Sequence, residues 1–136
     1  MAAQVQITNV DASTQSIYVT FNVVLSGSYP TGGDLLNFAT ATADPQFVGL
    51  LAAVESSSLI NIDVWSMGGG TIGASNLVSY DPVVTKSGTP ATINPASGIK
   101  LKVSALSATT EHAAGAYESQ YTGDIITGMA VFTKLI

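Results

Sequence analysis

The chain has 136 residues and a formal net charge of −5, with nine carboxylates and only four basic side chains, all of them lysine. So few cations cannot line a phosphate backbone, and the lack of cysteine excludes disulfides, thiolate zinc sites and cysteine nucleophiles. No apolar run approaches the roughly 18 residues that a membrane-spanning helix requires. We therefore expect a single domain, residues 1–136, with neither nucleic acid nor a membrane as partner.

Two strands are predicted near the N-terminus. Residues 4–10 alternate between apolar and polar side chains, and a cluster of turn-forming residues, 11–16, follows. Residues 17–25 alternate more strictly, with the period of a half-buried strand. The side chains predicted on the inner face of this second strand are Ile17, Val19, Phe21, Val23 and Leu25.

Residues 17–39 as a whole are predicted to form a strand, a turn and a second strand. The turn covers residues 27–34, where Pro30 fixes φ and the neighbouring Gly32 and Gly33 can adopt positive φ. This connection is too long for a two-residue hairpin, so we expect a loop that projects beyond the sheet. The side chains expected to point from the second arm into the core are Leu36 and Phe38, or Leu35 in a different register.

One short helix is predicted over residues 44–55. Asp44 would be its N-cap and Pro45 its first helical residue. Apolar side chains recur in this segment at spacings of three and four, although Gly49 weakens the helical pattern. These apolar residues are Phe47, Leu50, Leu51 and Val54.

Four further strands are predicted in the rest of the chain. Residues 99–106 alternate most regularly, and Pro82 places the end of the strand over residues 77–84 at a sheet edge. Residues 124–135 are apolar on both faces, which is typical of a strand that is central in a sandwich or buried against another subunit. In the strand over residues 59–67, the expected inward residues are Ile60, Ile62 and Val64, and the outward ones are Asn61, Asp63 and Trp65.

About seven strands, short turns and at most one short helix predict an all-β fold. The expected architecture is an antiparallel two-sheet sandwich, jelly-roll-like, or failing that a small barrel. With 46 % hydrophobic and 10 % charged residues, the composition favours apolar surface buried between subunits; an Ala- and Thr-rich β domain is the simpler alternative. The first ten residues lack the features of a signal peptide, so we expect folding in a cytoplasm.

The sequence offers no strong catalytic or metal-binding set. A serine–histidine–acid arrangement would need the single histidine, His112, with Glu111 and either Ser107 or Ser119, but no nucleophile-elbow motif surrounds them. A carboxylate pair could serve a glycosidase, although turns and caps already explain most of the aspartates. Calcium held by loop aspartates is the remaining metal hypothesis. Those aspartates are Asp11, Asp34 and Asp124. Because none of these sets has a recognised motif, we expect that the chain is not an enzyme and binds no cofactor and no metal.

A glycine-rich stretch, residues 68–73, resembles a phosphate-binding loop only superficially. It lacks the lysine and hydroxyl that such a loop requires, so we expect a flexible turn. Trp65 and Tyr80 flank it and could form a platform on which a sugar stacks. Aromatic packing at a sheet edge or a subunit contact is the simpler interpretation.

Two segments taken together resemble a known group of proteins. Residues 25–38 read LSGSYPTGGDLLNF, and residues 111–134 read EHAAGAYESQYTGDIITGMAVFTK. The pair resembles small virion structural proteins of tailed bacteriophages, of the head decoration or cement type. Members have a strand–SGxYxTGGD–strand hairpin near the N-terminus and an ELAAGAYP…D…I…F…K ending. His112 stands here in place of the usual leucine, and Glu118 where proline is common.

The resemblance implies a β-sandwich that trimerises on the outside of an icosahedral head and is made in the host cytoplasm. It implies the major capsid protein as partner, with neighbouring shell subunits bridged against the pressure of packaged DNA. The alternative is a receptor- or glycan-binding module of a phage fibre or tail. The residues expected to make assembly contacts are Tyr29, Pro30, Thr31, Gly32, Gly33, Asp34, Tyr117 and Phe132.

Overall fold

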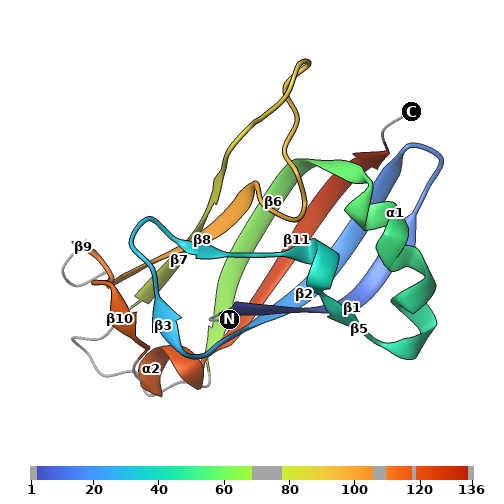
Figure 1. Cartoon of the computed structure of the whole chain (residues 1–136). Helices are drawn as coiled ribbons and strands as arrows, with labels where there is room; N and C mark the ends of the chain where they lie inside the picture. Colours follow the sequence, from blue (N-terminus) through green and yellow to red (C-terminus); the bar gives the residue numbers. More distant parts are fainter. Residues whose placement is uncertain (1–2, 69–77, 106–109, 118, 135–136) are drawn as a thin grey trace.

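The fold is an all-β sandwich, as the alternation of apolar residues predicts (Figure 1). The computed structural model describes residues 3–68, 78–105, 110–117 and 119–134. Its five-stranded sheet is antiparallel except for the short strand at one edge. In spatial order it contains β5 (Thr42–Ala43), β1 (Ala3–Ala12), β2 (Ser16–Leu25), β11 (Ile125–Lys134) and β6 (Ser57–Gly68).

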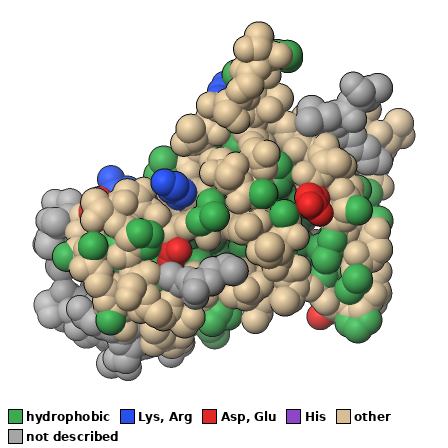
Figure 2. All heavy atoms as spheres, viewed as in Figure 1, with side chains coloured by type: hydrophobic (Ala, Val, Ile, Leu, Met, Phe, Trp, Pro, Cys, Tyr) green, Lys and Arg blue, Asp and Glu red, His purple; other side chains and the backbone are tan. Residues whose placement is uncertain are grey.

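A smaller antiparallel sheet packs against the first, and a two-stranded ribbon lies at one end. The smaller sheet contains β4 (Asp34–Leu35), β8 (Ile99–Ala105) and β7 (Val78–Val84), with β9 (Thr110–Glu111) beside β8. The ribbon pairs β3 (Ser28–Tyr29) with β10 (Gly115–Ala116). Figure 2 shows few charged side chains on the face seen in Figure 1, in keeping with the composition.

The two sheets enclose one core, with Phe38 at its centre. The Phe38 ring meets Phe21 edge-on at 5.0 Å between ring centroids and Phe132 at 5.3 Å. The period-2 predictions for β2 and β8 are confirmed, because their inner side chains are all buried. These residues are Ile17, Val19, Phe21, Val23 and Leu25 on β2, and Ile99, Leu101 and Val103 on β8.

Segment 17–39 is not the predicted hairpin. β2 already pairs with β1 along one edge and with β11 along the other, so the chain after it has no free edge of β2 to join. Instead β3 pairs with β10, and β4 crosses to the other sheet and pairs with β8. The second arm still contributes to the core through Leu36 and Phe38, both fully buried, while Leu35 is only partly buried.

The predicted helix over residues 44–55 is two shorter pieces. A 3₁₀ helix, η2 (Pro45–Leu50), leads directly into a single α-helical turn, α1 (Leu51–Glu55). Pro45 does begin the helical segment, but the side chain of Asp44 makes no capping hydrogen bond. The other helical turns are η1 (Phe38–Thr40), which the side chain of Asn37 caps, and α2 (Ser119–Thr122).

The inward assignment of Ile60 on β6 is wrong. The register of β6 against β11 shifts between Asn61 and Leu59, so Ile60 is the extra residue of a β-bulge. The bulge reverses the alternation at this point: Leu59 is buried and Ile60 is 57 % exposed. Beyond the bulge the prediction holds, with Ile62 buried and Trp65 exposed.

The order of the strands does not confirm a jelly roll. The consecutive strands β1 and β2 pair within one sheet, and so do β7 and β8. The edge position predicted from Pro82 is confirmed, because β7 is the outermost strand of the smaller sheet. β11 lies between β2 and β6, buries one face in the core and leaves Ile125 and Met129 exposed on the other.

Candidate functional site

The two segments that carry the family resemblance meet in space. Tyr29 of β3 lies opposite Gly115 of β10, and the backbone N–H of Tyr117 donates to the carbonyl of Gly27 at 3.0 Å. Backbone pairing therefore joins the first segment to the second at one end of the sandwich, where β3, β10 and α2 lie together (Figure 1). We call this region the motif junction.

One carboxylate of the second segment holds the loop of the first. Oε2 of Glu111 accepts a hydrogen bond from the hydroxyl of Tyr29 at 2.6 Å and from the backbone N–H of Gly32 at 2.7 Å. These two donors, with a smaller contribution from the charge of Lys102, lower the pKa of Glu111. Burial and the Glu111 bond raise the pKa of Tyr29, so its proton stays on the phenol.

A second tyrosine–carboxylate pair closes the far side of the same loop. The hydroxyl of Tyr117 donates to Oδ2 of Asp34 at 2.6 Å, and both residues are buried. Burial raises the pKa of Asp34, while hydrogen bonds from Tyr117 and from the backbone of Leu35 act in the opposite direction. The loop is thus held at both ends by residues far away in the sequence.

A third tyrosine–carboxylate pair argues against the sugar-stacking platform that Trp65 and Tyr80 could have formed. Tyr80 is 5 % exposed, and its hydroxyl donates to Oδ2 of Asp124 at 2.7 Å. Its ring therefore packs inside the molecule and offers no face to a sugar. Trp65, the other aromatic residue considered for such a platform, is 41 % exposed.

His112 belongs to an aromatic cluster. Its ring contacts Tyr29, Tyr117 and Tyr121, with centroid distances of 5.3, 5.7 and 4.9 Å. Nδ1 bonds to the carbonyl of Ala113 at 2.5 Å, and Nε2 is buried without a partner among the described residues. The neighbouring Glu111 is bonded to Tyr29 and Gly32 instead.

The serine–histidine–acid arrangement that the sequence analysis considered gains no support from this geometry. Ser107 lies outside the described residues, and the side chain of Ser119 is not among those the structure describes. Histidine and tyrosine rings packed edge to face are a structural cluster that shapes the motif junction.

Most of the predicted assembly residues are buried within the chain. Pro30, Thr31 and Gly32 are exposed, and these three residues form the tip of the loop. Gly27 and Ser28, which precede the buried Tyr29, are exposed as well, so five of the eight loop residues are accessible, three of them at the tip. The buried members are Tyr29, Gly33, Asp34 and Tyr117 around the loop, and Phe132 in the core.

The glycine pair fixes the path of the loop. Gly32 has φ of 95° and Gly33 has φ of 124°, values that side chains with a Cβ rarely adopt. A Cβ at Gly33 would also lie 3.0 Å from Cβ of Lys100, whereas one at Gly32 would meet nothing within 4 Å. Gly33 is thus required for packing as well as for conformation, and Gly32 for conformation alone.

The loop aspartates do not form a cation site in the part of the chain that the structure describes. That part contains no group of three or more histidine and carboxylate side chains placed to hold a metal. Asp34 and Asp124 each accept from a tyrosine, and Asp11 is exposed in β1. Of the glycine-rich stretch, residues 69–73 lie outside the described residues.

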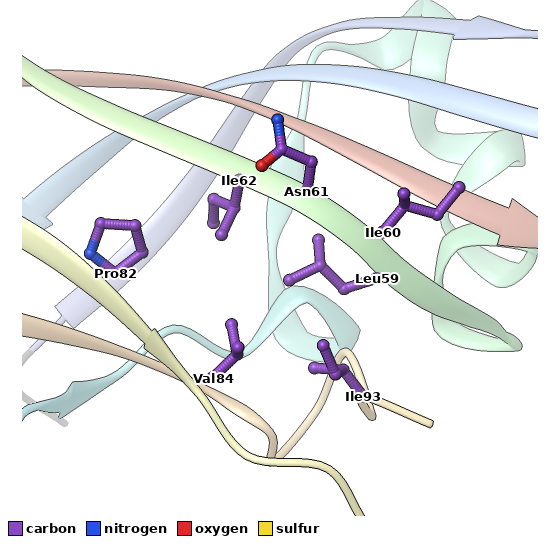
Figure 3. A pocket seen from close by; sticks show the side chains of 7 residues that line it. All are labelled: Leu59, Ile60, Asn61, Ile62, Pro82, Val84 and Ile93. Carbon is purple, nitrogen blue, oxygen red and sulfur yellow. The ribbon is translucent and has the colours of Figure 1, made fainter. Parts of the chain in front are cut away.

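A pocket between β6 and β7 has no counterpart in the sequence predictions. It has a volume of about 160 Å³ and lies between the edge strands of the two sheets (Figure 3). The bulge at Ile60 helps to shape it, and an alternating pattern gives no signal for a bulge. Its lining is apolar apart from one amide: Leu59, Ile60, Asn61, Ile62, Pro82, Val84 and Ile93.

Comparisons with known proteins identify no relative of this chain. No protein-family model matches the chain, and neither the curated proteins nor the solved structures yield a significant match. Among the described residues, no helix is long and apolar enough to cross a membrane. The chain is an all-β sandwich in which two tyrosine–carboxylate hydrogen bonds hold a loop with an exposed tip.

Proposed function

We propose that this chain is a non-enzymatic decoration, or cement, protein of a bacteriophage head. In this role it oligomerises, as a trimer, on the exterior of the capsid and stabilises the shell by bridging neighbouring subunits of the major capsid protein. The contact to the shell is the exposed tip of the loop at the motif junction, which consists of Pro30, Thr31 and Gly32. The protein acts at the virion surface after synthesis in the host cytoplasm.

The observation that carries the proposal is the contact between the two resembling segments. Glu111 of the second segment holds Tyr29 and Gly32 of the first, and Tyr117 holds Asp34. Residues that appear unrelated in the sequence thus serve one purpose, which is to hold an exposed three-residue tip in a fixed shape. A preorganised loop loses little conformational entropy on binding, which suits a repeated contact on a rigid shell.

The tip itself is suited to a protein surface. It contains one proline, one threonine and one glycine and carries no charge. Such a tip gains affinity from shape and backbone hydrogen bonds, not from ion pairs. The carboxylate of Glu111 lies beside the tip, bonded to the N–H of Gly32, so the salt dependence of the contact is expected to be that of one charge, weaker than for a contact built from opposite charges.

The proposal is tested with phage capsids that lack the protein. Purified protein is mixed with these capsids, bound protein is measured by co-sedimentation, and the melting temperature of the shell is recorded. We expect saturable binding and a higher melting temperature. Gly32→Val should weaken binding because valine resists positive φ. Gly49→Val, at a glycine without positive φ, is the matched control.

Two results would overturn the proposal. Wild-type protein that neither binds the capsids nor changes their melting temperature would remove the decoration function. Binding by Gly32→Val equal to that of wild type and of Gly49→Val would remove the loop tip as the contact. The two outcomes concern different claims and can be told apart in one titration series.

A glycan- or receptor-binding module of a fibre or tail is the second candidate. The exposed Trp65 favours it, because an indole face can stack on a sugar. The buried Tyr80 counts against it, since it removes the second wall of the platform. Glycan-array or cell-adsorption binding that disappears in Trp65→Ala would favour this function over decoration.

A further inference from the structure

The outer face of the five-stranded sheet gathers exposed apolar side chains. Nine large apolar residues are exposed in the described part of the chain, and five of them lie on this face. Their exposed fractions run from 41 to 52 %. They are Tyr18 and Val24 on β2, Ile125 and Met129 on β11, and Trp65 on β6. We call the outward positions of β2, β11 and β6 the outer sheet face.

The strand register makes these residues near neighbours. Directly opposed residues in antiparallel strands point to the same side, so each row across the three strands forms part of one surface. Threonine and asparagine fill the places between the apolar residues, and Thr127 donates to Oδ1 of Asn22 at 3.1 Å. The rows are Tyr18–Val131–Asn61, Thr20–Met129–Asp63 and Asn22–Thr127–Trp65.

The small number of charged residues on the outer sheet face indicates which kind of partner it can bind. Asp63 is the one charged residue in the three rows, although the chain carries nine acidic and four basic residues. A strongly acidic partner would find no cation in these rows, and a strongly basic one would find a single carboxylate. A second copy, itself at −5, would meet few like charges on these rows: Asp63 in the middle row and, at the β1 edge beside Tyr18, Asp11.

The size of the face also suits a second copy. With the neighbouring β1 included, the four adjacent strands of about ten residues span roughly 19 by 33 Å, or about 630 Å² in projection. Each partner in a standard interface contributes about 800 Å². An open sheet face does not enclose a small ligand, but it can pack against the surface of a neighbouring copy with side chains interdigitated.

We propose that the outer sheet face is the surface through which copies of this chain associate. The inference rests on the self-association included in the proposed function but not on any shell partner. It assigns Tyr18, Met129 and Trp65 to the buried centre of a contact between copies. The loop tip of the motif junction then remains free for a different partner.

The single tryptophan gives a direct test without any substitution. Trp65 is the only tryptophan in the chain, so selectively excited tryptophan fluorescence reports on this face alone. Wild-type protein is diluted from high micromolar to low nanomolar concentration while its mass is followed by light scattering or mass photometry. We expect a multiple of the chain mass at high concentration, and a red shift of the emission as the mass falls to that of one chain.

Substitutions then locate the contact. Met129→Lys places a charge in the middle row and should make the protein monomeric, with red-shifted emission at all concentrations. Val48→Lys is the matched control, because Val48 is similarly exposed but lies on η2. Asp63→Asn removes the charge in that row and should strengthen association at low salt. Unchanged thermal melting of each variant shows that the fold is intact.

Three outcomes would overturn the inference. The first is a monomer with constant emission over the whole range. The second is an oligomer whose mass and emission are the same in Met129→Lys and Val48→Lys. The third is a monomer whose emission shifts only when glycans are added, which assigns the face to carbohydrate. None of these measurements uses capsids, so failure here and failure of the decoration function are distinguishable.

Discussion

The hydroxyl of Tyr29 donates a 2.6 Å hydrogen bond to Oε2 of Glu111, across 82 positions of sequence. The same oxygen accepts from the backbone N–H of Gly32. The carboxylate of Glu111 therefore holds both the buried Tyr29 at the start of the loop and the exposed Gly32 at its tip. Any change at Glu111 should reach the loop directly, which makes this residue the place to test the motif junction.

Glu111→Gln should destabilise the protein at neutral pH and much less in acid. The folded state lowers the pKa of Glu111, so its contribution to stability is present above the unfolded value of about 4.3 and disappears as the pH falls through the folded value. Glutamine keeps an acceptor oxygen but loses the charge-assisted bonds. Urea unfolding at pH 7 and pH 3 measures the difference between wild type and variant. A difference that is the same at both pH values would contradict the assignment.

Asp34→Asn should show the opposite trend with pH. Burial raises the pKa of Asp34, so its favourable contribution is present below the unfolded value of about 3.9 and is lost as the pH rises through the folded value. Asparagine keeps an oxygen for the hydroxyl of Tyr117 and never ionises. The stability of wild type relative to the variant should therefore fall between pH 3 and pH 7. The same urea series measures it, and a relative stability that rises over this range would refute the burial argument.

The sequence predicts the strands well because burial imposes a period of two. The buried rows of β2 and β8 and the core positions of Leu36 and Phe38 follow from that period. The alternation does not indicate which strands are hydrogen-bonded to each other. It cannot show that β11, from the far end of the chain, occupies the edge of β2 that the predicted hairpin needed. A bulge such as the one at Ile60 is equally invisible, because one extra residue reverses the alternation locally.

The sequence predicted which segments form the candidate site, but not the hydrogen bonds that hold them together. The motifs indicated the loop and its partner segment, but the bonds of Tyr29 and Tyr117 to carboxylates depend on tertiary contacts about 80 positions apart. The same contacts explain why three of the predicted contact residues, Tyr29, Asp34 and Tyr117, are buried. A tyrosine in a turn can equally well face outward, and nothing local in the sequence distinguishes the two.

Phe38→Ala should remove the centre of the core. The side chain is fully buried and packs edge-on against Phe21 and Phe132, so truncation loses both apolar burial and two aromatic contacts. Losses of about 3–5 kcal/mol are typical of such a change. Chemical denaturation at neutral pH measures the loss. Val48→Ala, at a 52 % exposed position, is the control and should change stability by less than about 0.5 kcal/mol. Similar losses in the two variants would contradict the central role of Phe38.

Gly128→Ala should destabilise the sandwich although it adds only one methyl group. Gly128 lies on β11 between Phe21 of β2 and Val64 of β6, with its inner side against the core. A Cβ there would collide with the ring of Phe21 and lie 2.8 Å from the backbone oxygen of Asp63. The ring is held by Phe38 and the oxygen belongs to a paired strand, so neither can move freely.

The expected cost of this overpacking is about 1–3 kcal/mol in the free energy of unfolding. Gly49→Ala is the matched control, because a Cβ at Gly49 meets nothing within 4 Å and Gly49 has no positive φ. That substitution should be neutral or stabilise by up to about 1 kcal/mol, since alanine restricts the unfolded chain. Urea denaturation of the two variants side by side decides the matter. Equal effects at the two glycines would show that the close contact of β11 with Phe21 is relieved by movement of the sheet.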